Sequence, residues 1–295
     1  MSMTMDPVRA REVGQRLYRA FRSTGILGEI SMPEHLLPPG VERGSREQLH
    51  FITLTVAIDY MRDADVLWAA GRQTFADPAA CYLYDPRQVA QASLEKLIAD
   101  MGKYKLAKKT LKDAEIWRTV CLTLVRHFEG DVYNLLRQAA FDAPRAIEMI
   151  RNPRYRFPYL KGPKIAPLWV RMLEDSWQGH HFARLEKLPI PVDIHIGAAT
   201  VMTGCLRGTT VGSFEEFREA VVQVWSQACQ GTAHYPLQFD ESLWHLSRRG
   251  CRNTPAFPCV HQGECPVGDF CTSTELKVNV GATNAAPAVQ FVAHR

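Results

Sequence analysis

Apolar residues recur along most of the chain at the three- and four-residue intervals of an α-helix. Within residues 8–22, Val13, Leu17 and Phe21 fall on one face of such a helix. Residues 47–58 are apolar nearly throughout, which predicts a buried helix. No segment alternates convincingly between apolar and polar residues, as a half-buried strand would, and no internal repeat is visible. The pattern therefore predicts an all-α protein.

Polar residues at the edges of the apolar segments predict where helices begin. Five residues are predicted as helix N-caps because their side chains can accept a backbone N–H of the first turn: Asp63, Ser93, Asp113, Asp142 and Ser213. Pro144 fits the first turn after Asp142, and Glu216 completes a capping box with Ser213. Residues 272–295 are rich in Ala, Thr and Val and are predicted to form a loosely attached tail.

The composition is that of an ordinary globular protein. Of the 295 residues, 46% are hydrophobic and 22% charged, enough for one large domain or two small ones. No apolar run approaches the ~20 residues that a transmembrane helix needs, so no membrane association is expected. The N-terminal segment lacks the apolar region of a secretory signal. We therefore expect a cytoplasmic protein, nucleoid-associated if bacterial, in a compartment where disulfides are rare.

Four of the eight cysteines lie close together near the C-terminus, with seven, five and five residues between them: Cys251, Cys259, Cys265 and Cys271. Four soft thiolates suit zinc or an iron–sulfur cluster. The run lacks the tight cysteine pair of a zinc ribbon, which favours a 4Fe–4S cluster held by the loop 251–271. Zinc and four unrelated structural cysteines are the alternatives. The remaining four are predicted to be small buried apolar side chains: Cys81, Cys121, Cys205 and Cys229.

The segment Tyr159–Ala166 is predicted to connect two helices through a tight turn. Gly162 permits a sharp change of direction, and the amides that open the next helix can bind a phosphate group. Lys164 is predicted in the first turn of that helix. Further on, Asp193 follows a proline-stiffened approach and is predicted to cap another helix. Taken singly, a surface lysine and a helix cap are ordinary features.

Taken in order, these motifs resemble the helix-hairpin-helix superfamily of DNA glycosylases, the superfamily of endonuclease III. Leu97–Lys108 is similar to the Leu-Ile…Gly-x-Tyr…Lys-Ala stretch of that family. Gly162–Ala166 resembles the Gly-x-Lys-x-Ala of its bifunctional members, and Val192–Ile196 resembles its Val-Asp-Thr-His-Val. The four clustered cysteines follow at the C-terminal end, as in the cluster-bearing branch. The resemblance extends over residues 45–271, with Leu160 in place of the first glycine of the family hairpin.

The resemblance implies a two-lobed, all-α helix-hairpin-helix glycosylase fold with a C-terminal iron–sulfur cluster loop. One helical domain is expected from residues 1–45 and 190–271, which include the cluster loop. A second helical domain is expected from residues 46–189, with the hairpin at 157–170. Residues 272–295 would form the C-terminal tail.

The resemblance also implies an enzyme, a DNA glycosylase of base-excision repair that removes a damaged or mispaired base. Lys164 would form a Schiff base with the sugar and add AP-lyase activity, and Asp193 would stabilise the positive charge of the sugar. The implied partner is double-stranded DNA with a lesion or mismatch, bound by a monomer. The alternative is a non-catalytic iron–sulfur DNA-binding protein on the same scaffold, which the loss of the hairpin glycine at Leu160 would favour.

Four residues are predicted to contact DNA: Gly162, Lys161, Tyr60 and His195. The resemblance places Tyr60 where an aromatic ring would stack on a flipped base or fill its gap, although a core tyrosine also fits. Asp59, beside it, would read a base edge or lie at an exposed helix end. His195 would contact phosphate or support the site. The lysine-rich stretch 103–118 predicts either phosphate contacts or a solvated helix face.

Overall fold

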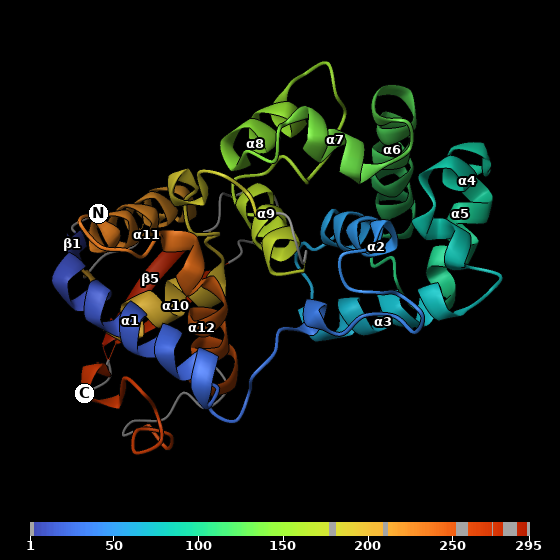
Figure 1. The fold of residues 1–295 in the computed structure, drawn as a ribbon. Helices are drawn as coiled ribbons and strands as arrows, with labels where there is room; N and C mark the ends of the chain where they lie inside the picture. The colour runs from blue at the N-terminus through green and yellow to red at the C-terminus, as the bar shows by residue number, and fades with distance from the viewer. Residues whose placement is uncertain are drawn as a thin grey trace. The chain divides into compact units, whose positions relative to one another are not determined.

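The protein is described by a computed structural model that covers residues 3–176, 181–208, 212–251, 259–272, 274–279 and 288–293. The chain divides into two compact units. Unit 1 combines both chain ends, Met1–Ser31 and Pro189–Arg295, and unit 2 is the central segment Met32–Leu188. Figure 1 draws the central segment in blue to yellow-green and the two ends in dark blue and in yellow to red.

The first boundary between the units lies at residues 31 and 32, whereas the sequence suggested residues 45 and 46. The difference has a local cause in the short helix η1 (Pro33–His35). The carbonyl oxygen of Pro33 accepts a hydrogen bond from Arg72, and Glu34 pairs with Arg171, both of unit 2. These polar contacts attach the segment to unit 2.

Unit 1 is mainly helical. Its principal elements are α1 (Pro7–Ser23), α10 (Ile194–Met202), α11 (Phe214–Cys229), η4 (Pro236–Phe239), α12 (Asp240–His245), the π-helix η5 (Leu246–Cys251) and η6 (Gly268–Phe270). Helix α1 packs against α11 and α12, and buries Val13 and Leu17, as its apolar face predicts. Phe217 and Trp225 of α11 are fully buried in the same core. Burial of these faces defines the unit.

The described residues of unit 1 also form two small antiparallel sheets: β1 (Met3–Met5) with β2 (Leu206–Gly208), and β3 (Gly212–Ser213), β5 (Ala288–Ala293) and β4 (Thr274–Asn279) in that order. The prediction of a loose tail at 272–295 is therefore wrong for the described strands. Leu276 of β4 lies opposite Phe291 of β5, and both side chains are buried. Strand β4 packs on α10, and this contact removes the apolar side of the strand from water.

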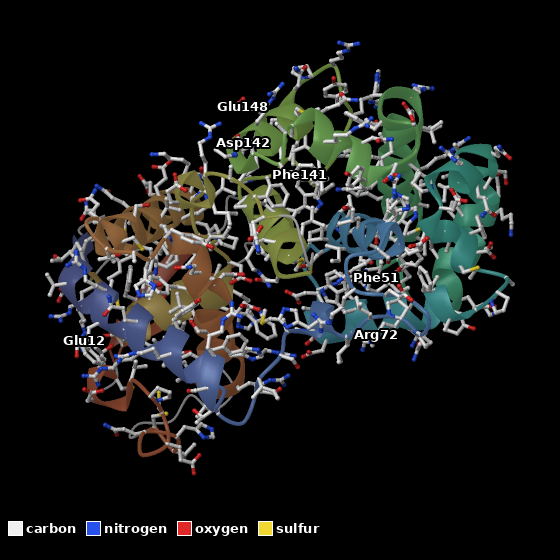
Figure 2. All side chains as sticks on the ribbon, in the orientation of Figure 1. Glu12, Phe51, Arg72, Phe141, Asp142 and Glu148 are labelled. Atoms are coloured by element: carbon white, nitrogen blue, oxygen red, sulfur yellow. The ribbon has the colours of Figure 1, made fainter. Side chains whose placement is uncertain are left out.

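Unit 2 contains α2 (Arg46–Val56), α3 (Ala64–Ala76), η2 (Cys81–Tyr84), α4 (Pro86–Gln91), α5 (Leu94–Lys103), α6 (Thr110–Phe128), α7 (Val132–Gln138), α8 (Ala143–Arg151), α9 (Ile165–Ser176) and η3 (Leu185–Lys187). Helix α2 is its buried centre, as the apolar run predicts. Phe51 of α2, labelled in Figure 2, is fully buried, and its ring packs edge-on against Trp68. Trp169 donates to the hydroxyl of Thr53 on the same helix at 2.9 Å. Across the described residues of both units, no helix is long and apolar enough to cross a bilayer.

Most of the predicted helix caps are confirmed. Four side chains accept a backbone N–H of the turn that follows them: Asp63, Ser93, Asp142 and Ser213. The prediction for Asp113 is wrong, because α6 begins three residues earlier, at Thr110. The buried carboxylate of Asp113 instead accepts the N–H groups of Lys108 and Lys109 at 2.7 and 2.9 Å. It therefore satisfies backbone donors at the start of the helix from inside its first turn.

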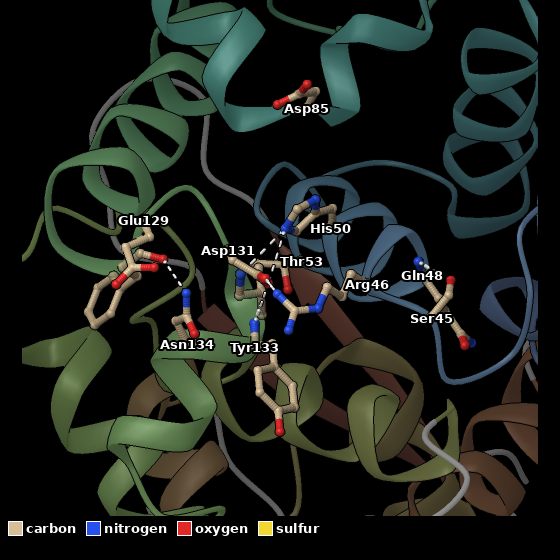
Figure 3. A network of polar contacts seen from close by, with 12 residues as sticks. Ser45, Arg46, Gln48, His50, Thr53, Asp85, Glu129, Asp131, Tyr133 and Asn134 are labelled. Atoms are coloured by element: carbon tan, nitrogen blue, oxygen red, sulfur yellow. Dashed lines mark hydrogen bonds and ion pairs between the residues drawn. The ribbon is translucent and has the colours of Figure 1, made fainter.

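A polar network joins the beginnings of α2 and α7 in unit 2 (Figure 3). The carboxylate of Asp131, the N-cap of α7, accepts a hydrogen bond from Arg46, and its Oδ1 lies 3.6 Å from Nε2 of His50. The N–H of Tyr133 donates to the same carboxylate at 2.8 Å. Burial alone would raise the pKa of Asp131, but the nearby His50, the hydrogen bond from the N–H of Tyr133 and the charge of Arg46 lower it.

Candidate functional site

The predicted hairpin forms the connection between α8 and α9 in unit 2. Its left-handed residue is Tyr159, with φ of 62°, and not Gly162. The N–H of Gly162 donates to the carbonyl oxygen of Tyr159 at 2.9 Å, and a Cβ on Gly162 would lie 3.1 Å from that oxygen. Glycine is therefore favoured here by close backbone approach. Leu160, which replaces the glycine of the family motif, is fully buried, so a formed turn accommodates the substitution.

Lys164 directly precedes α9 and lies beside a carboxylate from a distant part of the sequence. Its Nζ is 3.8 Å from Oδ2 of Asp59, which follows α2. The side chain of Asp59 is 9% exposed and that of Lys164 is 30% exposed. Asp59 is thus not at an exposed helix end, and its ion pair with Lys164 was not foreseen from the sequence.

Tyr60 stacks on a second tyrosine of the hairpin. Its ring and that of Tyr159 have centroids 4.4 Å apart and planes inclined by 17°. The hydroxyl of Tyr60 donates to Asp113. Burial and this hydrogen bond raise the pKa of Tyr60 well above its ordinary value, so the hydroxyl stays protonated and acts as a donor. Tyr60 is half-buried. Its exposure therefore lies between that of a core tyrosine and that of a ring free to stack on a flipped base, the two roles that the sequence allowed.

Lysines from the beginning of α6 surround the tyrosine pair. Nζ of Lys112 lies 5.0 Å from the ring centroid of Tyr159 and 5.7 Å from that of Tyr60, and Nζ of Lys109 lies 5.6 Å from that of Tyr60. Both lysines are exposed, within cation–π range of the rings. We call this set the hairpin surface: Tyr60, Tyr159, Lys109, Lys112 and Lys164. Stacked aromatic rings among positive charges have the chemistry that binds a nucleic-acid strand.

The remaining predicted hairpin residue, Lys161, is exposed one position before Gly162. Its carbonyl oxygen accepts a hydrogen bond from Arg151 of α8 at 3.2 Å, which ties the turn to the helix before it. A DNA contact by Lys161 or Gly162 stays a prediction.

In unit 1, Asp193 is the N-cap of α10, as predicted. Its Oδ1 accepts the N–H groups of His195 and Ile196 at 2.8 and 3.0 Å. The ring of His195 is oriented by two neighbours: Nδ1 lies 3.3 Å from the hydroxyl of Ser247, and the ring packs edge-on against Trp244 at 5.6 Å. These contacts fit a supporting role for His195. Lys164 belongs to unit 2 and Asp193 to unit 1.

The four clustered cysteines also lie in unit 1, and all four line one cavity. Apolar side chains complete its wall, among them Leu27, Met202 and Leu246. The described residues of the loop 251–271 are Cys251 and 259–271, because 252–258 lie outside the described part of the chain. All eight cysteines are described, and none of them forms a disulfide in this structure. Thiolates are the type of ligand that binds a metal or an iron–sulfur cluster.

Burial, with a smaller contribution from neighbouring cysteines, raises the pKa of three of these thiols: Cys251, Cys265 and Cys271. Burial and the neighbouring cysteines raise the pKa of Cys251 far above its ordinary value. Burial raises the pKa of Cys265 to about 11, and Cys271 and Cys259 contribute. Without a cation these groups stay protonated, whereas a bound metal would stabilise the thiolates.

Of the four scattered cysteines, Cys121, Cys205 and Cys229 are buried as predicted, whereas Cys81 is partly exposed.

Two arginines of α1 fix the end of the cysteine loop. Arg9 donates to the carbonyl oxygen of Phe270 at 2.7 Å, and Arg16 pairs with Asp269 at 2.9 Å. Both guanidinium groups lie 4.9 Å from the ring centroid of Phe270. A Cβ on Gly268 would lie 2.1 Å from the carbonyl oxygen of Gln262, so only glycine fits this close approach. Contacts with α1 and the close backbone approach at Gly268 therefore hold this loop in place.

Comparison with solved structures identifies the fold. The chain matches no family model and no curated protein. It is similar to a trapped covalent endonuclease III–DNA intermediate, an estranged-adenine complex, with a TM-score of 0.55 and 14% identity over 90% of this chain and 98% of the other. It is also similar to a non-covalent endonuclease III–DNA complex, with a TM-score of 0.54 and 14% identity over 91% and 96% of the two chains.

A third similar structure is an 8-oxoguanine DNA glycosylase from Pyrobaculum aerophilum complexed with 8-oxoguanosine, with a TM-score of 0.45 and 18% identity over 81% of each chain. The first two comparisons cover nearly the whole of both chains. The protein has the fold of the helix-hairpin-helix DNA glycosylases, as the sequence motifs predict.

Proposed function

We propose that the protein is a DNA glycosylase of base-excision repair that removes a damaged or mispaired base and, through Lys164, also acts as an AP lyase. The observation that carries the proposal is the hairpin lysine, which lies beside a buried carboxylate on a surface of stacked tyrosines and lysines. The fold supports it, because the similar endonuclease III structures are DNA complexes, one of them a trapped covalent intermediate. The proposed partner is double-stranded DNA, bound by a monomer in the cytoplasm.

In the proposed reaction the neutral amine of Lys164 attacks C1′ of the target nucleotide. The bond between nitrogen and C1′ forms as the bond between C1′ and the base breaks, and the base leaves with the electron pair and takes up a proton. Opening of the sugar ring yields a Schiff base. Removal of a C2′ proton then expels the 3′ phosphate by β-elimination, which cuts the strand.

The departing base leaves positive charge on the sugar, and the carboxylate of Asp193 is the proposed group that stabilises it. The proposal therefore requires Asp193 and Lys164 to reach the same deoxyribose. Because C1′ is inaccessible inside a duplex, the nucleotide must leave the stack. We assign the hairpin surface, with Lys161 and Gly162, to the DNA backbone and the vacated stack, and His195 to support of the site.

Borohydride trapping on a panel of lesion-bearing duplexes tests the proposal. Wild type should form a covalent adduct with one lesion, Lys164→Ala should form none, and Asp193→Asn should slow base release by about 10²–10³-fold. Lys187→Ala, which removes an exposed lysine of the same unit, is the control and should trap normally. Binding to DNA without base release from any lesion would favour the non-catalytic alternative. Base release without trapping would contradict the proposed lyase activity and leave the proposed glycosylase activity standing.

We further propose that Cys251, Cys259, Cys265 and Cys271 hold a 4Fe–4S cluster, with zinc as the alternative. The support is the shared cavity and the absence of a tight cysteine pair. When bound, the cluster would cross-link the loop to the core of unit 1. Anaerobically purified protein should be yellow-brown and contain iron and acid-labile sulfide in equal amounts, and Cys265→Ser should lose both. Cys81→Ser is the matched control, and zinc without sulfide would contradict the cluster.

A further inference from the structure

The contact between Asp59 and Lys164 is built into the fold of unit 2. The N–H of Asp59 donates to the carbonyl oxygen of Val56 at 3.0 Å, which continues the end of α2 in a tight turn. The Asp59 side chain is 9% exposed, and its Oδ2 lies 3.8 Å from the Lys164 ammonium. Burial of a carboxylate is costly unless partners stabilise its charge. The ion pair with Lys164 supplies part of that stabilisation.

Contacts of the residues after Asp59 hold this segment in place within unit 2. One residue after Asp59, the ring of Tyr60 stacks on Tyr159 of the hairpin. Two residues further, Arg62 donates to the carbonyl oxygens of Leu106 and Lys105 at 2.7 and 3.3 Å. The tyrosine stack thus joins the segment after Asp59 to the hairpin that carries Lys164, and Arg62 joins the same segment to the residues before α6.

The charged groups around the pair are of both signs. Arg62 is close enough for the Asp59 charge to act on its pKa, which burial lowers. From α6, Lys109 and Lys112 lie over the tyrosine rings, and Asp113 accepts from Tyr60. Within this set of charged groups, the carboxylate of Asp59 lies 3.8 Å from the Lys164 ammonium.

We infer that Asp59 is a positioning residue for Lys164, whose carboxylate orients the hairpin amine and stabilises its protonated form in the DNA-free protein. The inference deepens the proposed function and rests on it only for the identity of Lys164 as the nucleophile. A lysine side chain has several rotatable bonds, so a fixed partner charge restricts the volume that the amine explores. The positioned amine must then lose its proton before it attacks C1′.

Two measurements on the full chain test the inference. The first is competitive labelling of lysines with trace acetic anhydride across pH, without DNA, read by mass spectrometry for each lysine. An opposite charge within about 4–6 Å shifts protonation by about 1–3 pH units, and the partial exposure of Lys164 argues for the lower end. Asp59→Asn should therefore move half-maximal labelling of Lys164 to lower pH by about one unit. Asp59→Glu should restore it in part.

Asp100→Asn is the matched control, because Asp100 pairs with Lys96 at 2.7 Å on another face of the same unit. It should leave the labelling profile of Lys164 unchanged. An unchanged Lys164 profile in Asp59→Asn would overturn the inference. If Asp59→Asn fails to fold, the wild-type protein alone still tests the inference. A wild-type labelling profile of Lys164 that coincides with that of the exposed Lys187 would also overturn the inference.

The second measurement is the rate of borohydride trapping on a duplex with an abasic site, across pH. In Asp59→Asn the pH profile should shift in the same direction as the labelling, and the maximal rate should fall, since the amine is less well placed. A purely structural role would lower the rate equally at every pH. An Asp59-dependent labelling profile without any trapping by wild type would refute the proposed lyase function and leave the positioning contact standing.

Discussion

Replacing Glu34 by alanine would leave the buried guanidinium of Arg171 with one carboxylate fewer. In unit 2, Nη2 of Arg171 donates to Oε1 of Glu34 at 2.5 Å, and the two side chains are 5% and 2% exposed. Asp175, one turn further along α9, lies 3.2 Å from the same guanidinium and is 20% exposed. The pair connects η1 to α9 inside the unit, so its loss affects the core and not the surface.

The expected loss follows from burial. Removing one partner of a buried ion pair costs about 3–5 kcal/mol, because the remaining charge stays desolvated. Asp175 still faces Arg171, which places the expected loss in the free energy of unfolding near 3 kcal/mol, the lower end of that range. For a unit of this size the melting temperature would fall by roughly 6–12 °C. Glu34→Gln, which can still accept a hydrogen bond, should lose about half as much.

Urea unfolding followed by tryptophan fluorescence measures this effect, since Trp68, Trp117 and Trp169 are all buried in unit 2. Glu186→Ala, at an exposed position of the same unit, is the control and should stay within about 0.5 kcal/mol of wild type. The double variant Glu34→Leu with Arg171→Met should recover most of the loss. A Glu34→Ala variant as stable as wild type, or a double variant as unstable as the single one, would refute the reasoning.

Three further predictions concern DNA binding, acid stability and packing. Lys112→Ala should reduce the slope of log affinity against log salt by about one for duplex DNA, measured by fluorescence anisotropy, and an unchanged slope would exclude a phosphate contact there. The contacts that lower the pKa of Asp131 stabilise the fold above the ordinary carboxyl value of about 3.9, and this stability is lost as pH falls through the lower folded value. Asp131→Asn should therefore lower the free energy of unfolding at pH 7 and make it less dependent on pH in acid; an equal acid dependence in both proteins would contradict this. Gly197→Ala would place a Cβ 2.6 Å from the Phe217 ring and should cost about 1–3 kcal/mol in a thermal melt, with partial rescue by Phe217→Leu; a neutral effect would show that the ring moves freely.

Local chemistry made much of the fold predictable. The caps at Ser93 and Asp142 and the capping box at Ser213 depend on hydrogen bonds within three residues, so the sequence alone contains them. The cap of Asp193 was predictable on the same ground. The N-cap rule failed at Asp113. Its carboxylate accepts hydrogen bonds from the nearby N–H of Lys108 and from the hydroxyl of Tyr60, which is distant in the sequence.

The strands of the C-terminal segment show the opposite case. β4 and β5 pair with each other, β5 also pairs with Gly212–Ser213, and β4 packs on α10 while β5 contacts α11. Small residues with weak alternation carry little local information about such pairing, because what stabilises a strand is its neighbour. Only the folded chain supplies that neighbour.

The same distinction between local patterns and tertiary contacts applies to the candidate site. The resemblance to family motifs singled out Lys164 and Asp193, and their clustering singled out the four cysteines, because motifs and cysteine clusters are local patterns. The sequence contained no sign that Asp59 pairs with Lys164 or that Tyr60 stacks on Tyr159, since these partners come from turns far apart in the chain. Which carboxylate meets which amine is set by how helices pack, and packing depends on the shape and burial of the whole core.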